Sequence, residues 1–167
     1  MALPLAMLAG AWILVQALYH MGWRLNLTRS MPLGFHHMVD ATSRPNLTIP
    51  SGSLVEFCPP LWVTPTRFLF YEKGMCSSGG APMFKRVIAT EGDVVIVNTD
   101  GMRVNGVLVS LSGQISTVAA KQIGCFVMAH DEYWVYGEGS SPGMAAHSFD
   151  SRYIGAIRRG QILSVGV

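Results

Sequence analysis

The stretch Met83-Phe84-Lys85-Arg86-Val87-Ile88-Ala89-Thr90-Glu91-Gly92-Asp93-Val94-Val95-Ile96-Val97 contains two apolar runs separated by a short polar turn. Short runs rich in β-branched residues and bounded by Gly and Asp are typical of β-strands. Alternate side chains of an extended segment share a face, so Lys85 lies on the same side as Val87 and Ala89. The stretch therefore predicts two strands, the first with a lysine on an otherwise apolar face.

The same pattern of short extended runs and glycine-rich turns continues along most of the chain. Asp100-Gly101 and Asn105-Gly106 are dipeptides typical of tight hairpin turns. No helix stands out after the N-terminal segment. The sequence therefore predicts a mostly β domain over residues 26–167, with a coiled-sheet or barrel-like fold. Further extended runs are expected over 54–57, 68–71, 125–129, 133–136, 153–157 and 162–165.

The composition excludes several classes of function. A chain of 167 residues is long enough for one domain with a substantial core. The net charge is only +2 and no dense Lys/Arg cluster occurs, so nucleic acid is not an expected partner. No Cys-x-x-Cys pair exists, and the loop 137–143 lacks the Lys-Ser/Thr ending of a phosphate-binding loop. Neither a metal nor another cofactor is therefore expected.

The N-terminus is expected to be a membrane anchor over residues 1–23. No charged side chain occurs from Met1 to Tyr19, and roughly 20 apolar residues suffice to span a bilayer as a helix. Trp23 and Arg24 then supply the aromatic and cationic side chains common at headgroups. The alternatives are a cleaved signal peptide, which would need a basic start and an Ala-x-Ala site, and a buried helix, which usually shows a polar face.

The charges and the cysteines disagree about which side of the membrane the domain faces. Arg24 and Arg29 follow the apolar segment, which by the positive-inside rule favours the cytoplasm, although long domains translocate despite such charges. Cys58 and Cys76 bracket a segment rich in Pro and aromatic residues, and a bridge between them would contribute on the order of 3 kcal/mol in an oxidising compartment. The alternative is that both are free buried thiols, together with Cys125.

Ser30 and Lys85 are the candidate catalytic residues. Ser30 lies in Asn26-Leu27-Thr28-Arg29-Ser30-Met31-Pro32-Leu33-Gly34, just after the apolar segment. A hydroxyl is a weak nucleophile until a base takes its proton, and a lysine can do so once burial lowers its pKa from about 10.4. The alternative is that Lys85 is an ordinary solvated strand lysine. The first interpretation predicts a Ser/Lys peptidase at a membrane surface.

Further short motifs follow Ser30-Met31-Pro32 along the chain: Phe57-Cys58-Pro59-Pro60, Lys85-Arg86-Val87, Glu91-Gly92-Asp93-Val94-Val95, Val104-Asn105-Gly106 and Ser148-Phe149-Asp150-Ser151-Arg152-Tyr153-Ile154-Gly155. In this order they resemble the type I signal peptidase family, most closely its short TraF-type branch of conjugative plasmid transfer. The resemblance covers nearly the whole chain. It implies an all-β coiled catalytic domain, which agrees with the pattern of short strands.

The resemblance also implies a role for each matched residue. Ser30 would be the nucleophile and Lys85 the general base, while the Thr28 hydroxyl and the Ser30 backbone N–H would form the oxyanion hole. Ser148 would orient the lysine, and Asp150 and Arg152 would form an ion pair that braces their loop. From the residues alone, Thr28 is equally an ordinary strand threonine, and the ion pair a surface turn bridge worth about 0–1 kcal/mol.

One segment departs from the family's pattern. The larger leader peptidases carry a stretch rich in Asp and Asn before the supporting serine. This chain instead has Gly137-Glu138-Gly139-Ser140-Ser141-Pro142-Gly143. Hydrogen bonding around Ser148 must therefore differ, and no role is predicted for Glu138.

The resemblance implies a membrane-anchored serine endopeptidase of the bacterial inner membrane, with one transmembrane helix and a catalytic domain facing the periplasm. Its substrate would be a prepilin or another leader-bearing protein held in the membrane. Inner-membrane lipid and components of a type IV secretion or pilus assembly system would be its partners. Water would resolve the acyl-enzyme on Ser30 by hydrolysis, whereas the substrate's own N-terminal amine would resolve it by cyclisation.

Other functions remain open at this point. The nearest is a general leader peptidase, against which the short chain and the segment between Cys58 and Cys76 argue. A soluble, self-cleaving repressor-type protein is opposed by the apolar N-terminus. A non-enzymatic scaffold for pilus assembly on the same fold is the alternative from a different class.

Overall fold

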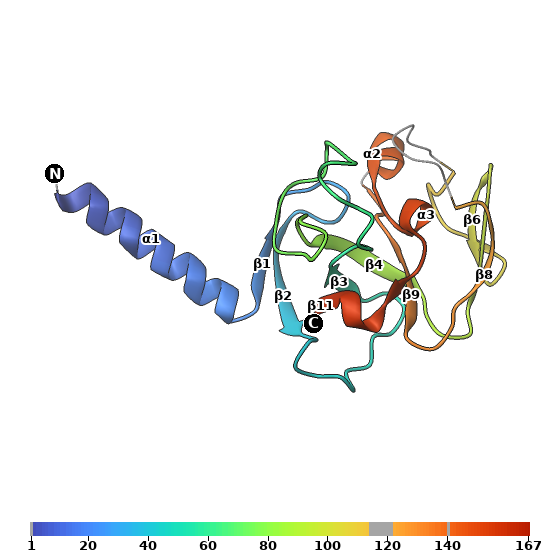
Figure 1. The fold of residues 1–167 in the computed structure, drawn as a ribbon, viewed down its shortest axis with the longest axis horizontal. Coiled ribbons are helices and arrows are strands. Elements are labelled where there is room, and N and C mark those ends of the chain that lie inside the picture. Colours follow the sequence, from blue (N-terminus) through green and yellow to red (C-terminus); the bar gives the residue numbers. More distant parts are fainter. Residues whose placement is uncertain (1, 114–121, 140) are drawn as a thin grey trace.

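The computed structural model describes residues 2–113, 122–139 and 141–167, which form an N-terminal helix followed by a mostly β domain (Figure 1). The predicted fold class is thus confirmed in its main feature. The helices are α1 (Ala2–His20), α2 (Pro142–His147), α3 (Ser151–Ile154) and the 3₁₀ turn η1 (Arg159–Gln161). The strands are β1 (Trp23–Asn26), β2 (Gly34–Asp40), β3 (Leu54–Phe57), β4 (Met83–Ala89), β5 (Val94–Asn98), β6 (Gly101–Val104), β7 (Val107–Leu108), β8 (Gly124–Val127), β9 (Glu132–Tyr136), β10 (Ile157–Arg158) and β11 (Ile162–Gly166).

The strands form two antiparallel sheets. The larger sheet has seven strands in the order β1-β2-β11-β3-β4-β9-β10, and the smaller has four in the order β7-β6-β5-β8. Strand β4 lies between β3 and β9, with Val55 opposite Lys85 and Val135 opposite Val87. The described strands therefore make two open sheets rather than one closed barrel.

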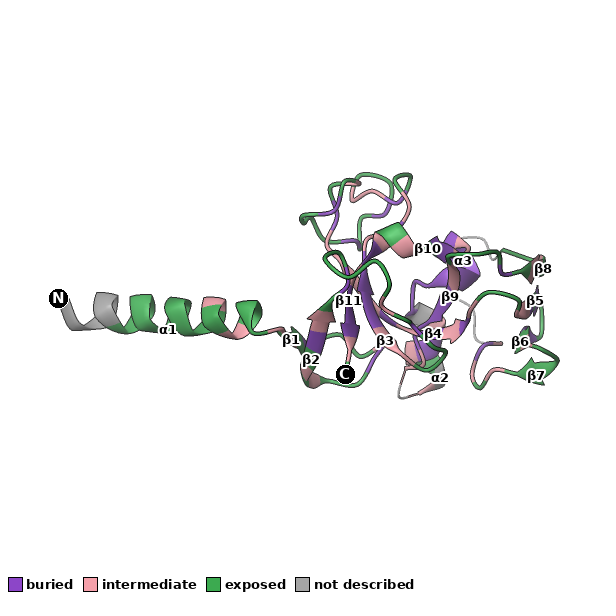
Figure 2. Cartoon of the chain, turned by 90° about the horizontal axis from the view of Figure 1, so that it is seen from below, coloured by how far each residue is buried: buried purple, intermediate pink, exposed green. Residues whose placement is uncertain are grey.

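Each sheet covers its own hydrophobic core, and strand β9 serves both. Val135 packs into the core of the larger sheet with Val55, Phe57 and Val87, while Trp134 and Tyr136 pack into the second core. This division follows from the alternation of side chains along a strand. The buried residues of β9 therefore hold the two halves of the domain together. Figure 2 shows β4 and β9 in the middle of the domain, with buried and intermediate residues and no exposed ones.

The predicted hairpin turns are confirmed. Gly101 and Asn105-Gly106 stand at the turns that join β5 to β6 and β6 to β7. Asn105 and Gly106 have φ angles of 50° and 83°, the left-handed backbone that a two-residue hairpin turn needs. Asn98 closes the first turn, because its side chain accepts hydrogen bonds from the backbone N–H groups of Asp100 and Gly101.

Two of the expected strands are wrong. Residues 68–71 lie in a loop, and residues 153–157 divide between helix α3 and strand β10. Helix α3 begins at Ser151, and the side chain of the preceding Asp150 caps it by accepting from the Arg152 backbone N–H at 3.1 Å. Helix α2 was also not expected, and the Ser141 side chain caps it by accepting from the Met144 N–H. Local caps therefore override the extended pattern in this part of the chain.

Helix α1 projects away from the domain (Figures 1 and 2). Large apolar side chains that include Leu8, Trp12 and Ile13 are well exposed along it. At its far end, Arg24 stacks over the Tyr19 ring and donates a hydrogen bond to the Tyr19 carbonyl at 2.8 Å. Of the helices that the structure describes, none combines the length and the apolarity that a membrane crossing needs.

A disulfide joins Cys58 to Cys76, with their Cα atoms 5.5 Å apart, and Cys125 is a free, exposed thiol. The bridge closes a loop over a sequence separation of 18 residues. Val63 and Phe68 in this loop are buried in the core of the larger sheet. The loop is therefore fastened both by a covalent bond and by packing.

Replacing both Cys58 and Cys76 by serine should lower the free energy of unfolding by about 3 kcal/mol, because the unfolded chain regains the entropy of the open loop. Urea denaturation followed by tryptophan fluorescence measures this change. Cys125→Ser is the matched control and should leave the midpoint unchanged. An equal midpoint for the double variant and the wild type would contradict the prediction.

Candidate active site

Ser30 lies in the turn between β1 and β2, with its side chain facing Lys85. The turn leaves the sheet where Asn26 pairs with Gly34. The Lys85 Nζ donates a hydrogen bond to the Ser30 Oγ at 3.0 Å, although the residues are 55 positions apart in the sequence. The structure thus brings the predicted nucleophile and the predicted base into direct contact.

Lys85 is buried on the inner face of β4. Burial alternates along the strand, so that Lys85, Val87 and Ala89 point inward, and only 6% of Lys85 is exposed. Burial lowers its pKa to about 8, while the Asp150 carboxylate raises and the Arg152 guanidinium lowers that pKa to a smaller extent. The alternative of a solvated strand lysine is therefore wrong.

Gly137, the residue after β9, gives the lysine side chain its room. A Cβ atom at this position would lie 1.8 Å from the Ser148 Oγ and 3.1 Å from the Lys85 Cδ. Any other side chain would displace one of these two groups. Gly137 is thus a steric requirement of the site, a role that no pattern in the sequence predicted.

Ser148 lies against Gly137 and the stem of Lys85. Its hydroxyl is buried and has no hydrogen-bond partner among the described residues. The structure therefore places Ser148 beside the lysine without the hydrogen bond that an orienting role would use. That role stays a prediction.

Asp150 and Arg152 form a completely buried ion pair, so the alternative of a surface turn bridge is wrong. Arg152 Nε and Nη2 donate to the two carboxylate oxygens of Asp150, each at 2.9 Å, and both side chains have no exposed area. The guanidinium also lies 4.8 Å from the centre of the Tyr136 ring. Bidentate pairing of this kind fixes the relative orientation of both side chains.

The ion pair connects the segments that surround Lys85. Asp150 accepts a hydrogen bond from the Gly137 N–H at 3.1 Å. Arg152 Nη2 donates to the carbonyl oxygens of Ala145 at 2.6 Å and Ser148 at 3.3 Å. Helix α2, the residue after β9 and the Ser148 loop are therefore tied to one charged pair, as the bracing role predicts.

Thr28 lies beside the nucleophile, with its Oγ1 atom 3.5 Å from the Ser30 Oγ. Its hydroxyl donates to the Asn26 Oδ1 at 2.7 Å. None of the described residues accepts a hydrogen bond from the Ser30 backbone N–H, which leaves this donor for a substrate oxygen. The oxyanion role of Thr28 stays a prediction, and it requires the hydroxyl to turn away from Asn26.

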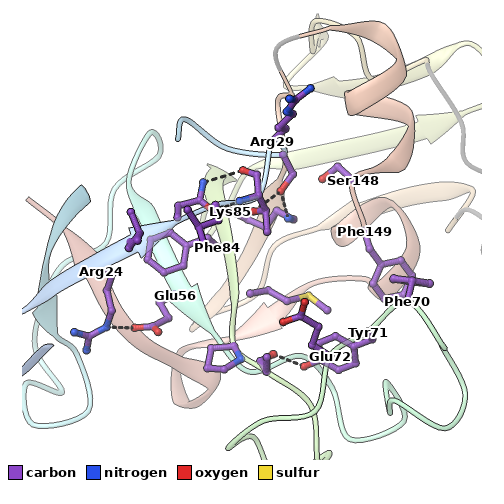
Figure 3. A pocket seen from close by; sticks show the side chains of 18 of the residues that line it. Arg24, Arg29, Glu56, Phe70, Tyr71, Glu72, Phe84, Lys85, Ser148 and Phe149 are labelled. Atoms are coloured by element: carbon purple, nitrogen blue, oxygen red, sulfur yellow. Dashed lines mark hydrogen bonds and ion pairs between the residues drawn. The ribbon is translucent and has the colours of Figure 1, made fainter. Parts of the chain in front are cut away.

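Ser30 and Lys85 open into a groove of about 700 Å³ (Figure 3). Its wall includes Phe70 and Phe149, whose rings lie 5.3 Å apart at a steep angle. Arg24 and Glu56 form an ion pair at 3.2 Å at another part of the lining. A groove of this size and apolar character accommodates a peptide segment beside the serine hydroxyl. The remaining lining residues include Leu25, Leu27, Arg29, Tyr71, Glu72, Met83, Phe84 and Met144.

Comparisons with known proteins define the family. The family model described as signal peptidase, peptidase S26, matches residues 1–167. The chain is 33% identical to a plasmid transfer protein TraF from Escherichia coli, covering 93% of this chain and 86% of the relative. It is 31% identical to a conjugal transfer protein TraF from Agrobacterium tumefaciens (strain 15955), covering 96% and 92%. The chain belongs to the peptidase S26 signal peptidase family and is related to TraF conjugal transfer proteins.

Among solved structures, a signal peptidase I from Enterococcus faecalis V583 matches with a TM-score of 0.40 and 20% sequence identity. The match covers 70% of this chain and 94% of that one.

The pKa of Lys85 predicts how activity should depend on pH. The amine must be neutral to accept a proton, so kcat/KM of the wild type should rise roughly tenfold per pH unit below the pKa and level off above about 8. A pH profile on a fluorogenic leader peptide measures this. Rising activity up to the pKa of a solvated lysine, near 10.4, would contradict the burial of the base.

Asp150→Ala should destabilise the domain by about 3–5 kcal/mol, because it leaves the Arg152 guanidinium buried without its counter-charge. Thermal and urea unfolding of the purified variant measure the loss. Asp100→Ala, in the exposed β5–β6 turn, is the control and should cost much less. Equal losses for the two variants would show that the buried pair contributes nothing special.

Proposed function

We propose that this chain is a serine endopeptidase that uses Ser30 as its nucleophile and Lys85 as its general base. The observation that carries the proposal is the 3.0 Å contact between the Ser30 Oγ and the Nζ of a buried lysine. Membership of a peptidase family supports it. No other group is needed to take the serine proton, since a pKa of about 8 leaves a minor but usable fraction of the Lys85 amine neutral near pH 7.

In the first step the neutral Lys85 amine accepts the Ser30 proton while the Ser30 Oγ attacks the carbonyl carbon of the scissile peptide bond. The Ser30 backbone N–H and the Thr28 hydroxyl donate to the oxygen that becomes negative. Lys85 then gives its proton to the leaving amine, the C–N bond breaks, and the substrate's acyl group stays on Ser30 as an ester.

In the second step a new nucleophile attacks this ester, again with Lys85 as the base. Water as the nucleophile gives a linear product. Alternatively, the N-terminal amine of the acyl part itself forms an amide with the ester carbonyl and releases Ser30, which gives a cyclic product made of the part of the substrate before the cut. The two routes share the acyl-enzyme and differ only in which group reaches its carbonyl carbon.

The proposed substrate is a prepilin or another leader-bearing protein held in the membrane for conjugative transfer. The related TraF proteins support this assignment. We further propose that α1 holds the chain at the bacterial inner membrane with the β domain in the periplasm, next to pilus or secretion components. The exposed apolar side chains of α1 and the Cys58–Cys76 bridge favour such a location.

Co-expression of the full chain with a candidate pilin precursor tests the proposal by intact mass spectrometry. Wild type should cut the precursor, whereas Ser30→Ala and Lys85→Ala should leave it intact. Processing by either variant would overturn the assignment of the dyad and favour a scaffold.

The mass of the product and a control variant complete the experiment. A processed product lighter than the expected linear chain by the mass of one water would identify cyclisation. Cys125→Ser changes an exposed side chain on β8 and is the control that should process normally.

A further inference from the structure

Asn26 is a buried polar residue at the end of β1, and it lies directly beneath the nucleophile turn. Only 5% of it is exposed. Its Oδ1 accepts hydrogen bonds from the Thr28 N–H at 3.0 Å and the Thr28 hydroxyl at 2.7 Å. Its Nδ2 donates to the carbonyl oxygens of Thr28 at 3.0 Å, Met31 at 3.2 Å and Pro32 at 2.9 Å.

These contacts use the whole hydrogen-bonding capacity of the amide. An asparagine side chain has two acceptor sites and two N–H donors. Both acceptor sites are occupied, and the two N–H groups are shared among three carbonyl oxygens. The partners come before and after Ser30, so the turn is wrapped around this single amide.

Few other backbone hydrogen bonds hold the turn, although the Met31 side chain is also buried. The segment from Leu27 to Leu33 contains neither helix nor strand. Outside Asn26, the Ser30 carbonyl accepts from the Gly139 N–H at 3.2 Å, and the Pro32 carbonyl accepts from the half-buried His36 ring at 2.9 Å. Asn26 is therefore the described side chain that ties both sides of the nucleophile to a strand.

We propose that Asn26 is a positioning residue that fixes the Ser30 hydroxyl against the Lys85 amine. The inference rests on the proposed Ser/Lys chemistry. Lys85 is placed by β4 and Ser30 by the turn, so their distance depends on how rigidly the turn is attached to β1. Asn26 supplies that attachment without touching the reacting atoms.

The effect should appear in the rate of serine acylation. A misplacement of about 1 Å at a reacting group costs about 100-fold in rate. Asn26→Ala removes all five hydrogen bonds. Asn26→Asp keeps the side-chain volume and the oxygen that accepts from Thr28, but it replaces the N–H donors with an oxygen that faces the carbonyl oxygens. It is the second variant, for use if the alanine variant does not fold.

The experiment measures acylation of the full chain in detergent by p-nitrophenyl butyrate, with Ser30→Ala as the background and circular dichroism as the check of folding. Each Asn26 variant should be acylated about 100-fold more slowly than wild type. With a leader peptide, kcat per folded molecule should fall while KM is unchanged, and active-site titration together with circular dichroism separates this fall from a loss of folded enzyme. Asn98→Ala removes an equivalent turn-closing amide from the β5–β6 hairpin and should acylate at the wild-type rate.

Wild-type acylation rates in the folded Asn26 variants would overturn the inference, and so would an equal loss in Asn98→Ala. The proposed function fails separately. Acylation of wild-type Ser30 without processing of any preprotein would overturn the endopeptidase assignment. The role of Asn26 would then be decided by the acylation rates of its variants. No acylation of wild-type Ser30 would overturn both.

Discussion

The burial of the Lys85 amine beside Ser30 is the constraint on which the rest of the site depends. An ammonium group loses its hydration on burial, and this cost is what makes the neutral base accessible. Such burial needs a central strand, and β4 lies between β3 and β9 in the larger sheet. It also needs space for the side chain, which the missing Cβ of Gly137 provides. The sheet topology and Gly137 therefore both serve to lower the pKa of Lys85 by burying its amine.

The Asp150–Arg152 pair braces this site without restoring the positive charge of Lys85. A lone buried carboxylate near Lys85 would favour the ammonium form and reduce the fraction of neutral amine. The Arg152 guanidinium opposes that influence, so the two charges act on the lysine pKa in opposite directions and burial remains the largest cause of its shift. A charged pair can therefore connect helix α2, the Ser148 loop and the end of β9 while the lysine keeps the pKa that the proposed reaction needs.

The sequence predicted the features that depend on local pattern. Alternation placed Lys85 with Val87 and Ala89 on one buried face, and Asn-Gly and Asp-Gly marked the hairpins. The Asp150 cap of helix α3 is a local contact, but the burial of Asp150 also depends on Gly137, which lies 13 positions away in the sequence. The role of Gly137 consists of its distances to Ser148 and Lys85, which no local pattern predicts. Asn26 bonds residues only two to six positions away, and its importance follows from the contact of Ser30 with the distant Lys85. An asparagine just before an irregular, serine-bearing turn was the one local signal available.

Ser30 lines the main groove, and Met31 and Pro32, which follow it in the sequence, line a second hollow of about 540 Å³. The two hollows share Arg29 and Met144 in their linings, and the second also includes Gly139. On the proposed mechanism, hydrolysis and cyclisation attack the same ester carbon and use the same base. The dyad alone therefore does not select between the two routes, and the outcome depends on which nucleophile reaches the ester.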